Sequence, residues 1–145
     1  MTDVRTVLAS KGRNVHTISK TNTVFEAVCK MVQYNVGALP VIEHSRVIGI
    51  ITERDYLRKI AVEGRSSKTT FVQEVMTPNP VCVTPDTPAP ECMQLMTKHR
   101  IRHLPVIVRD ELYGTLSVRD LVDHLTLEQQ QTINELTHYI QGTYT

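Results

Sequence analysis

The 145-residue sequence lacks an excess of charge of either sign. Its 16 lysines and arginines nearly balance 15 aspartates and glutamates, so the formal net charge is +1. Proteins that bind nucleic acids or anionic membranes usually carry a concentrated basic surface. The composition therefore argues against both partners and directs attention to local groups of side chains.

The sequence also lacks a long apolar run and a cysteine framework. No apolar stretch approaches the roughly 18 residues of a membrane-spanning helix, and the first residues resemble neither a signal peptide nor an Arg-rich transit peptide. Cys29, Cys82 and Cys92 are odd in number and have no CxxC spacing. Free thiols in a reducing compartment fit this pattern, so we expect a cytoplasmic protein with no membrane segment.

An internal repeat is the main feature that the sequence does contain. Gly49–Asp55 has the sequence GIITERD, and 65 residues later Gly114–Asp120 has the sequence GTLSVRD. The segment LPVI also recurs at this offset, at Leu39–Ile42 and Leu104–Ile107. A unit of about 60 residues buries so little apolar surface that its stability alone would be marginal. The two copies are therefore expected to pack together about a pseudo-two-fold axis.

Each copy has the pattern of a β-α-β-β-α unit. In the first copy we expect a brief strand at 15–19, a helix starting at a Thr23/Glu26 capping box, and a hairpin of strands at 38–42 and 47–51. The fold class is α/β, of the α+β kind, with two pseudo-symmetric repeats packed sheet to sheet and a C-terminal helix.

The hairpin of the first copy is expected to lead into a second helix. This helix should run from Asp55 to about Glu63, with Leu57, Ile60 and Ala61 facing inward, and end at Gly64.

A short helix is expected before each copy, because apolar residues recur there at helical spacing. The predicted organisation is a first repeat with its leading helix at 1–64, a linker at 65–70, a second repeat at 71–125, and a C-terminal helix and tail at 126–145. The C-terminal helix carries an apolar stripe, ends at Gly142, and packs on the body or on a second subunit; the stripe consists of Leu127, Ile133, Leu136 and Ile140.

The linker permits two interpretations. Arg65–Lys68 is basic and rich in hydroxyl groups, so it is either a flexible connection, which we favour, or a clamp for phosphate.

The repeated motif also permits two interpretations. In both copies a strand ends at a hydroxyl residue, Thr52 or Ser117, and a carboxylate, Asp55 or Asp120, follows three positions later. One interpretation is a capping box at a helix start.

The second interpretation depends on the arginine in each motif. Arg54 and Arg119 occupy the second helical position, where the helix dipole disfavours a cation, so capping does not require them. A hydroxyl, an arginine and a carboxylate at a helix N-terminus suit a phosphorylated ligand with sugar hydroxyls.

The second copy has a more cationic surface before its strand than the first. Arg100, Arg102 and His103 replace uncharged residues, and they form either a solvated basic face or a phosphate contact. His99 and His103 are four residues apart, but Pro105 requires the helix to end first, so a metal site is not expected. No nucleophile elbow, isolated carboxylate pair or P-loop is present, so we do not expect an enzyme.

The duplicated pattern resembles a tandem pair of cystathionine-β-synthase (CBS) domains, known as a Bateman module. The resemblance covers nearly the whole chain and depends on VGALPVIE with GIITERD, and on HRIRHLPVI with GTLSVRD. It implies a regulatory module that binds AMP, ADP, ATP, NAD(H) or S-adenosylmethionine between the repeats and signals by a conformational change. The alternative is a protein-interaction or dimerisation scaffold with no obligatory ligand.

The resemblance also implies roles for individual residues. Asp55 and Asp120 would hold ribose hydroxyls, and the neighbouring hydroxyl and basic side chains would lie near ribose and phosphate: Thr52, Arg54, Ser117, Arg119, Arg100, Arg102 and His103. The base pocket would be formed around Val36, Gly37, Ala38, Leu39, Pro40, Leu104 and Pro105. A stand-alone homodimer, joined through amphipathic helices, is expected by the same resemblance.

Overall fold

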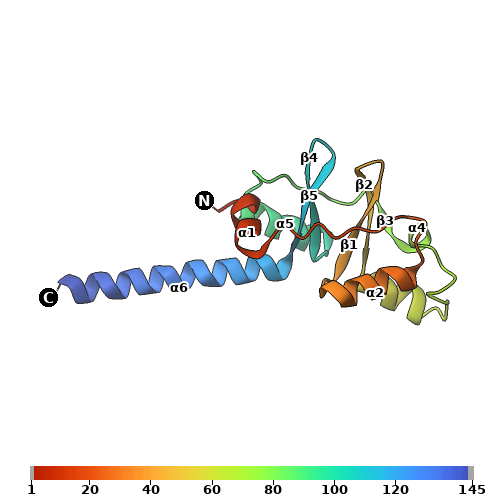
Figure 1. The fold of residues 1–145 in the computed structure, drawn as a ribbon. Coiled ribbons are helices and arrows are strands. Elements are labelled where there is room, and N and C mark those ends of the chain that lie inside the picture. The colour runs from red at the N-terminus through yellow and green to blue at the C-terminus, as the bar shows by residue number, and fades with distance from the viewer. Residues whose placement is uncertain (1, 144–145) are drawn as a thin grey trace.

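The computed structural model describes residues 2–143 and contains two similar halves, each built around a β-hairpin (Figure 1). In the first half β1 (Ala38–Glu43) pairs with β2 (Arg46–Thr52), and in the second half β4 (His103–Val108) pairs with β5 (Glu111–Ser117). Both hairpins have a register shift at the same place in the LPVI segment. The predicted duplication is therefore present in three dimensions.

Both hairpins turn through two residues with positive φ. The turns consist of His44 and Ser45 in the first half and of Arg109 and Asp110 in the second. Two-residue turns with positive φ at both positions match the right-handed twist of antiparallel strands. The matching turns fix the same register in both halves.

One face of each hairpin packs on a helix. In the first half α2 (Val24–Tyr34), which begins with the predicted capping box, contributes Val24, Ala27 and Met31 to a core with the hairpin. In the second half α5 (Ala89–His99) packs in the same way. The helix faces and the hairpin faces together form two separate hydrophobic cores.

The opposite face of each hairpin is buried as well. Ala38, Ile50 and Thr115 are at most 7% exposed, yet they belong to neither core. Side chains of a strand alternate between its two faces, so these residues lie on the faces away from the helices. The two hairpins therefore cover each other, as expected for sheet-to-sheet packing, and β2 and β5 join at Arg46 and Glu111 to continue one sheet.

The helix that precedes each repeat packs into the other half. The apolar residues of α1 (Val4–Lys11) lie in the core of the second half, and those of α4 (Val72–Val75) lie in the core of the first. Figure 1 shows α1 beside the start of α6, far from α2. The predicted boundaries at 64, 70 and 125 stay predictions, but the chain crosses between the halves twice.

This crossing explains the glycine in each copy of the motif. A Cβ on Gly114 would lie 2.3 Å from the carbonyl oxygen of Arg13, and one on Gly49 would lie 3.0 Å from the carbonyl oxygen of Thr77. Thr77 belongs to β3 (Thr77–Pro78), which pairs with β2. Each glycine thus admits the backbone that follows the crossing helix.

Two expectations for the first half are wrong. The brief strand at 15–19 is reduced to a single bridge between Ile18 and Val41. The helix after Thr52 is a short α-helix, α3 (Glu53–Asp55), followed by a π-helix, η1 (Tyr56–Ala61). Because the π-helical turn shifts the inward face, Ile60 is buried but Leu57 and Ala61 are exposed.

The helix of the second motif and the C-terminal helix are one continuous element. A single helix, α6, runs from Val118 to Thr143 and passes through Gly142. No proline interrupts this segment, and one glycine costs a helix only about 1 kcal/mol. Figure 1 shows the C-terminal part of α6 projecting from the body. Among residues 2–143, no helix combines the length and apolar character required to span a bilayer.

Candidate functional site: the junction between the repeats

The hydroxyl and carboxylate of each motif form a capping box. In the first half the Thr52 amide donates to Asp55 Oδ2 at 2.9 Å, and the Asp55 amide donates to Thr52 Oγ1 at 3.2 Å. In the second half the Ser117 amide donates to Asp120 Oδ2 at 2.9 Å, and the Asp120 amide donates to Ser117 Oγ at 3.0 Å. Capping is therefore real in both copies, and it uses one carboxylate oxygen of each aspartate.

The second oxygen differs between the halves. Asp55 Oδ1 lies 3.2 Å from Lys59 Nζ, which also donates to the carbonyl of Val75 at 2.7 Å. His124 stands four residues after Asp120, and it lies 3.3 Å from Glu128 instead. Within the described part of the chain, Asp120 Oδ1 has no hydrogen-bond or ion-pair partner. Asp120 can therefore accept a hydrogen bond from a ligand without breaking an ion pair.

The two repeats touch where Gly37 meets His103. A Cβ on Gly37 would lie 3.1 Å from His103 Nε2 and 2.6 Å from Glu53 Oε1. Arg54 Nη1 also donates to the carbonyl of Arg100 at a long 3.4 Å. Gly37 thus leaves room for an imidazole from the opposite repeat.

His103 connects this contact to the open carboxylate. Burial lowers the pKa of His103, while the negative charge of Asp120 opposes that change and the positive charge of Arg102 adds to it. A lowered pKa keeps the imidazole neutral at pH 7, with one nitrogen as donor and the other as acceptor. His103 thus contacts Gly37 of the first repeat and lies within the electrostatic influence of Asp120, and this polar region between the repeats is called the junction.

The remaining predicted residues surround this junction in different ways. Ala38, Pro40 and Pro105 are buried on the hairpin faces between the repeats. The side chains of Leu39 and Leu104 point into the two cores, so only their backbone is available for a base pocket. Four others are exposed or half-buried near the motifs and strand starts: Val36, Arg100, Arg102 and Arg119.

The sequence patterns did not single out Glu53. Its counterpart in the second repeat is Val118, so comparison of the copies offered no signal. Both residues occupy the same backbone position, since the Glu53 amide donates to the Gly37 carbonyl at 3.0 Å and the Val118 amide to the Arg102 carbonyl at 2.9 Å. The first repeat alone adds a carboxylate there.

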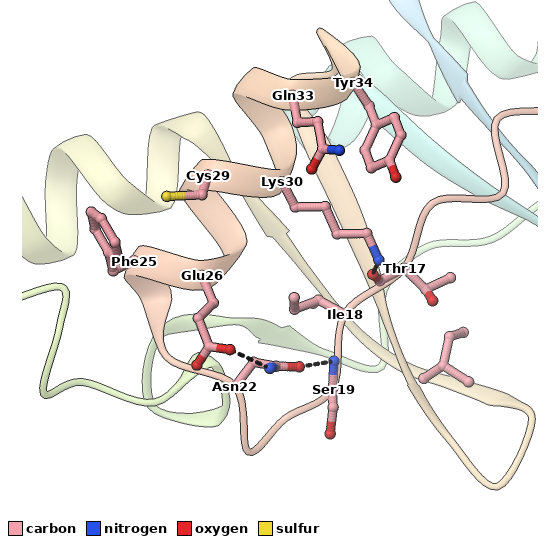
Figure 2. A pocket seen from close by; sticks show the side chains of 11 residues that line it. Thr17, Ile18, Ser19, Asn22, Phe25, Glu26, Cys29, Lys30, Gln33 and Tyr34 are labelled. Carbon is pink, nitrogen blue, oxygen red and sulfur yellow. Dashed lines mark hydrogen bonds between the residues drawn. The ribbon is translucent and has the colours of Figure 1, made fainter.

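A separate hollow of about 610 Å³ lies between α2 and the chain at 17–22, away from the predicted site residues (Figure 2). Asn22 crosses its floor: its amide nitrogen donates to Glu26 at 3.0 Å, and its amide oxygen accepts from the Ser19 amide at 3.0 Å. Lys30 also donates to the Thr17 carbonyl. The polar groups of this hollow hold the start of α2 in place.

The segment Arg65–Lys68 lies against the first half. Arg65 pairs with Glu74 at 2.8 Å, and the Lys68 ammonium lies over the ring of Phe25 at 5.1 Å. The Ser67 carbonyl accepts from the Phe25 amide at 2.9 Å, at the start of α2. These contacts favour the connecting role over a phosphate clamp. Residues 2–143 contain no group of three or more His, Cys, Asp or Glu side chains placed to hold a metal ion.

The CBS-domain family model matches the chain twice, at residues 4–62 and 72–127. The chain belongs to the CBS-domain family. The CBS pair is 44% identical to the mitochondrial CBS domain-containing protein CBSX3 of Arabidopsis thaliana, over 99% of this chain and 74% of that protein.

Solved structures show the same fold. A CBS-domain protein from Burkholderia ambifaria is 41% identical, with a TM-score of 0.83 over 88% of this chain and 96% of its own. CBS domain protein PAE2072 from Pyrobaculum aerophilum, solved in complex with AMP, is 24% identical with a TM-score of 0.74 over 82% of this chain and 89% of its own. The latter likeness is one of fold.

Proposed function

We propose that this CBS pair is a regulatory module that binds an adenine nucleotide or NAD(H) between its repeats and signals its occupancy by a conformational change. The contact of His103 with Gly37 and its proximity to Asp120 carry the proposal. A ligand at this junction would touch both repeats, so its binding would favour one relative packing over another.

The proposal gives the two aspartates unequal roles. Asp120 accepts hydrogen bonds from ribose hydroxyls through its open oxygen, and a neutral His103 supplies a donor or an acceptor beside it. Arg54, Arg100, Arg102 and Arg119 provide exposed cations for phosphate, with Ser117 near them. The AMP complex of the Pyrobaculum protein supports this class of ligand, because a protein of the same fold holds it.

The equivalent site around Asp55 is expected to differ. Its carboxylate is paired with Lys59. Its hydroxyl partner Thr52 pairs with Ala38 at the start of β1, where the first repeat has uncharged residues in place of the basic residues of the second repeat. We therefore propose that the two clefts differ in their phosphate preference. No catalytic step is assigned to either cleft.

We also propose that the CBS pair acts as a homodimer. The outer faces of α2 and η1 expose apolar side chains, which a second subunit would cover. Sedimentation that shows a monomer at micromolar concentration would contradict this. The cytoplasmic location stays a prediction; the name of the Arabidopsis relative places that protein in mitochondria.

Two measurements test the ligand proposal. Mass spectrometry of small molecules released from the purified protein should find an adenine nucleotide or dinucleotide. Calorimetry with AMP, ATP and NAD should then show binding that weakens when the ribose hydroxyl is removed in a deoxy analogue. Absence of binding at millimolar concentration for all three ligands would remove the proposal.

An interaction scaffold is the second candidate, because α6 exposes apolar residues along its projecting part. A scaffold needs the caps of Thr52 and Ser117 but no ligand. Under this alternative, nucleotides would leave the melting temperature and the oligomeric state unchanged.

A further inference from the structure

Two enclosed polar atoms beside β5 lack a hydrogen-bond partner. Thr115 is 2% exposed, and residues 2–143 offer its Oγ1 no partner. The side-chain oxygen of Asn14 is also enclosed and unpaired within this range, whereas the nitrogen of the same amide is not one of the enclosed, unpaired atoms. A buried polar group without a partner destabilises a fold. Each of the two atoms is therefore a candidate for binding a group from outside the chain.

The two residues come together at one edge of β5. The Thr115 amide donates to the carbonyl of Arg13 at 2.9 Å, and Asn14 follows Arg13 directly. Arg13 is itself fixed to the strand, because its Nε donates to the carbonyl of Tyr113 at 2.7 Å and its guanidinium lies over the Tyr113 ring, 4.1 Å from the centroid. Asn14 has a φ of 51°, a left-handed conformation that asparagine tolerates better than most residues. The backbone thus holds Asn14 against the strand that carries Thr115.

Thr115 lies on the same strand face as the hydroxyl of the second motif. Side chains two residues apart on a strand point to one face, about 7 Å from each other, so Thr115 shares its face with Ser117. Across the hairpin, His103 is opposite Ser117 and Pro105 is opposite Thr115. The Ser117 amide in turn donates to Asp120. A ligand held by Asp120 can therefore extend along β5, over Pro105, toward Thr115.

The two unpaired atoms differ in hydrogen-bonding type. The side-chain oxygen of Asn14 only accepts, whereas the Thr115 hydroxyl also donates. Adenine carries groups that complement both, since its exocyclic amine donates and its ring nitrogens accept. Guanine carries an oxo group in the place of this amine, and that group would oppose the Asn14 oxygen, acceptor against acceptor. The pair therefore suits adenine better than a purine with an oxo group.

The first half has no equivalent pair. Asn79 stands 65 residues after Asn14, has a similar φ of 47°, and donates its amide to the Ile48 carbonyl at 3.1 Å. The side chain of Asn79 is exposed, however, and Ile50 occupies the position that corresponds to Thr115. The fold thus forms without such a pair in one of its halves, so the pair in the second half is not a requirement of the fold.

We propose that Asn14 and Thr115 select an adenine base for the cleft at Asp120. The side-chain oxygen of Asn14 accepts from the exocyclic amine, and the Thr115 hydroxyl donates to a ring nitrogen. The inference rests on the nucleotide-binding function proposed above and adds the residues that choose the base. Because Thr115 is buried between the hairpin faces, a base that reaches it separates these faces. Recognition of the base is thereby joined to the change in packing between the repeats.

Calorimetry with AMP and inosine monophosphate tests the selection. The two nucleotides share ribose and phosphate, but inosine monophosphate has an oxo group where AMP has the amine. The wild-type protein should bind AMP about ten-fold or more tightly than inosine monophosphate, because the oxo group leaves the Asn14 oxygen unpaired. Equal affinities for the two nucleotides would overturn the inference.

Two variants assign the selection to the side chains. Asn14→Gly keeps a backbone that tolerates positive φ and removes the amide, so it should bring the two affinities to within about two-fold of each other. Thr115→Val keeps the shape and removes the hydroxyl, so the affinity for AMP should fall about ten-fold. If only a water molecule joins the two atoms, both variants would keep the wild-type affinities, and the inference would be overturned.

Asn79→Gly is the matched control for Asn14→Gly. It makes the same change at the equivalent position of the other half, where the side chain is exposed. The ratio of the two affinities should therefore stay at its wild-type value. A loss of this ratio as large as that in Asn14→Gly would indicate a general effect of a more flexible connection, and it would overturn the role of the Asn14 amide.

The nucleotide-binding function and the base selection fail separately. If neither AMP nor inosine monophosphate binds at millimolar concentration, the function and this inference are both removed. If the two nucleotides bind equally well and both lose affinity in Asp120→Asn, the function stands and only the base selection is removed.

Discussion

Asp55 and Asp120 occupy equivalent places in the two repeats, and each closes a capping box with the hydroxyl residue three positions earlier. Their second oxygens have different surroundings. Lys59 holds that of Asp55 at 3.2 Å, while the described residues leave that of Asp120 open. A repeated motif can therefore keep one structural role in both copies and leave a ligand-binding role to one of them.

The hairpin faces that lie between the repeats also differ, in the polarity of their side chains. The first repeat places Ala38 and Ile50 there, and the second places His103 and Thr115 at the equivalent positions. Thr115 Oγ1 is buried, and residues 2–143 offer it no hydrogen-bond partner. At these two positions the first repeat thus supplies apolar side chains and the second supplies polar ones.

The largest difference in stability is expected at the two motif glycines. A methyl group at Gly114 would meet a backbone oxygen at 2.3 Å, whereas at Gly49 the nearest atom is the flexible Met76 Sδ at 2.6 Å. Overpacking costs typically 1 to 3 kcal/mol, so Gly114→Ala should lower the free energy of unfolding by about 3 kcal/mol and Gly49→Ala by about 1 kcal/mol. Urea denaturation measures both losses. Equal losses would contradict the closer approach of the crossing backbone at Gly114 than at Gly49.

The aspartates should separate binding from stability. Asp120→Asn keeps the cap but loses a charge-assisted bond to ribose, worth about 1.5 to 3 kcal/mol, so AMP affinity should fall about ten- to a hundred-fold. Asp55→Asn should change AMP affinity much less. It breaks the partly exposed Lys59 pair and should lower the free energy of unfolding by about 1 kcal/mol at most. Calorimetry measures the AMP affinity of both variants, and thermal melting measures their stability. An equal loss of AMP affinity in the two variants would contradict the unequal roles of the two aspartates.

Thr115→Val should make the second repeat resemble the first. It removes a buried hydroxyl with no partner at nearly constant shape, so the unliganded protein should gain about 1 kcal/mol in unfolding free energy. The matched change Ile50→Thr should destabilise. A lower melting temperature for Thr115→Val would show that the hydroxyl has a stabilising contact. Asn14 is the first candidate, because it follows Arg13, whose carbonyl accepts from the Thr115 amide.

The smallest expected effect is the pH dependence due to His103. Burial lowers its pKa from the ordinary 6.5, so below that pH the unfolded chain binds more protons than the folded one. Its contribution to stability is therefore complete above about pH 6.5 and declines as the pH falls below that value. His103→Asn should reduce the difference in unfolding free energy between pH 7.5 and 5.5. An unchanged difference would place the pH dependence in other groups; Asp120, Arg102 and Glu53 are the charged neighbours to vary next.

The hairpins and caps could be predicted from sequence because their signals are local. The LPVI segment, the glycine and the motif recur at one offset, and Thr23 with Glu26 marks a helix start in any context. The Asp55–Lys59 pair also had a local signal, since its i,i+4 spacing places both side chains on one helical face. The meeting of His103 with Gly37 had none, because only the packing of the repeats brings them together.

The destination of the leading helices could not be predicted from their own pattern. Val4, Val7 and Leu8 show that α1 has an inward face, but not which core receives it. The exposure of Leu57 could not be predicted either, because the prediction used the spacing of an α-helix, about 3.6 residues per turn, for the whole segment. The Arg65 amide bonds to the Ile60 carbonyl and the Val62 amide to the Leu57 carbonyl, and such five-residue steps have no signature in the apolar spacing.

The crossing of α1 and α4 also sets an order of assembly during synthesis. The first half has its whole core once Val75 has left the ribosome, whereas α1, made first, must wait for Leu116 and Leu121, which follow it by more than 100 residues. Closure of so long a loop carries an entropic cost and slows folding. If the chain were cut within 65–70, each fragment would lack the helix that its own core needs and carry the one that the other requires. Two such fragments should reassemble when mixed, and neither should fold alone.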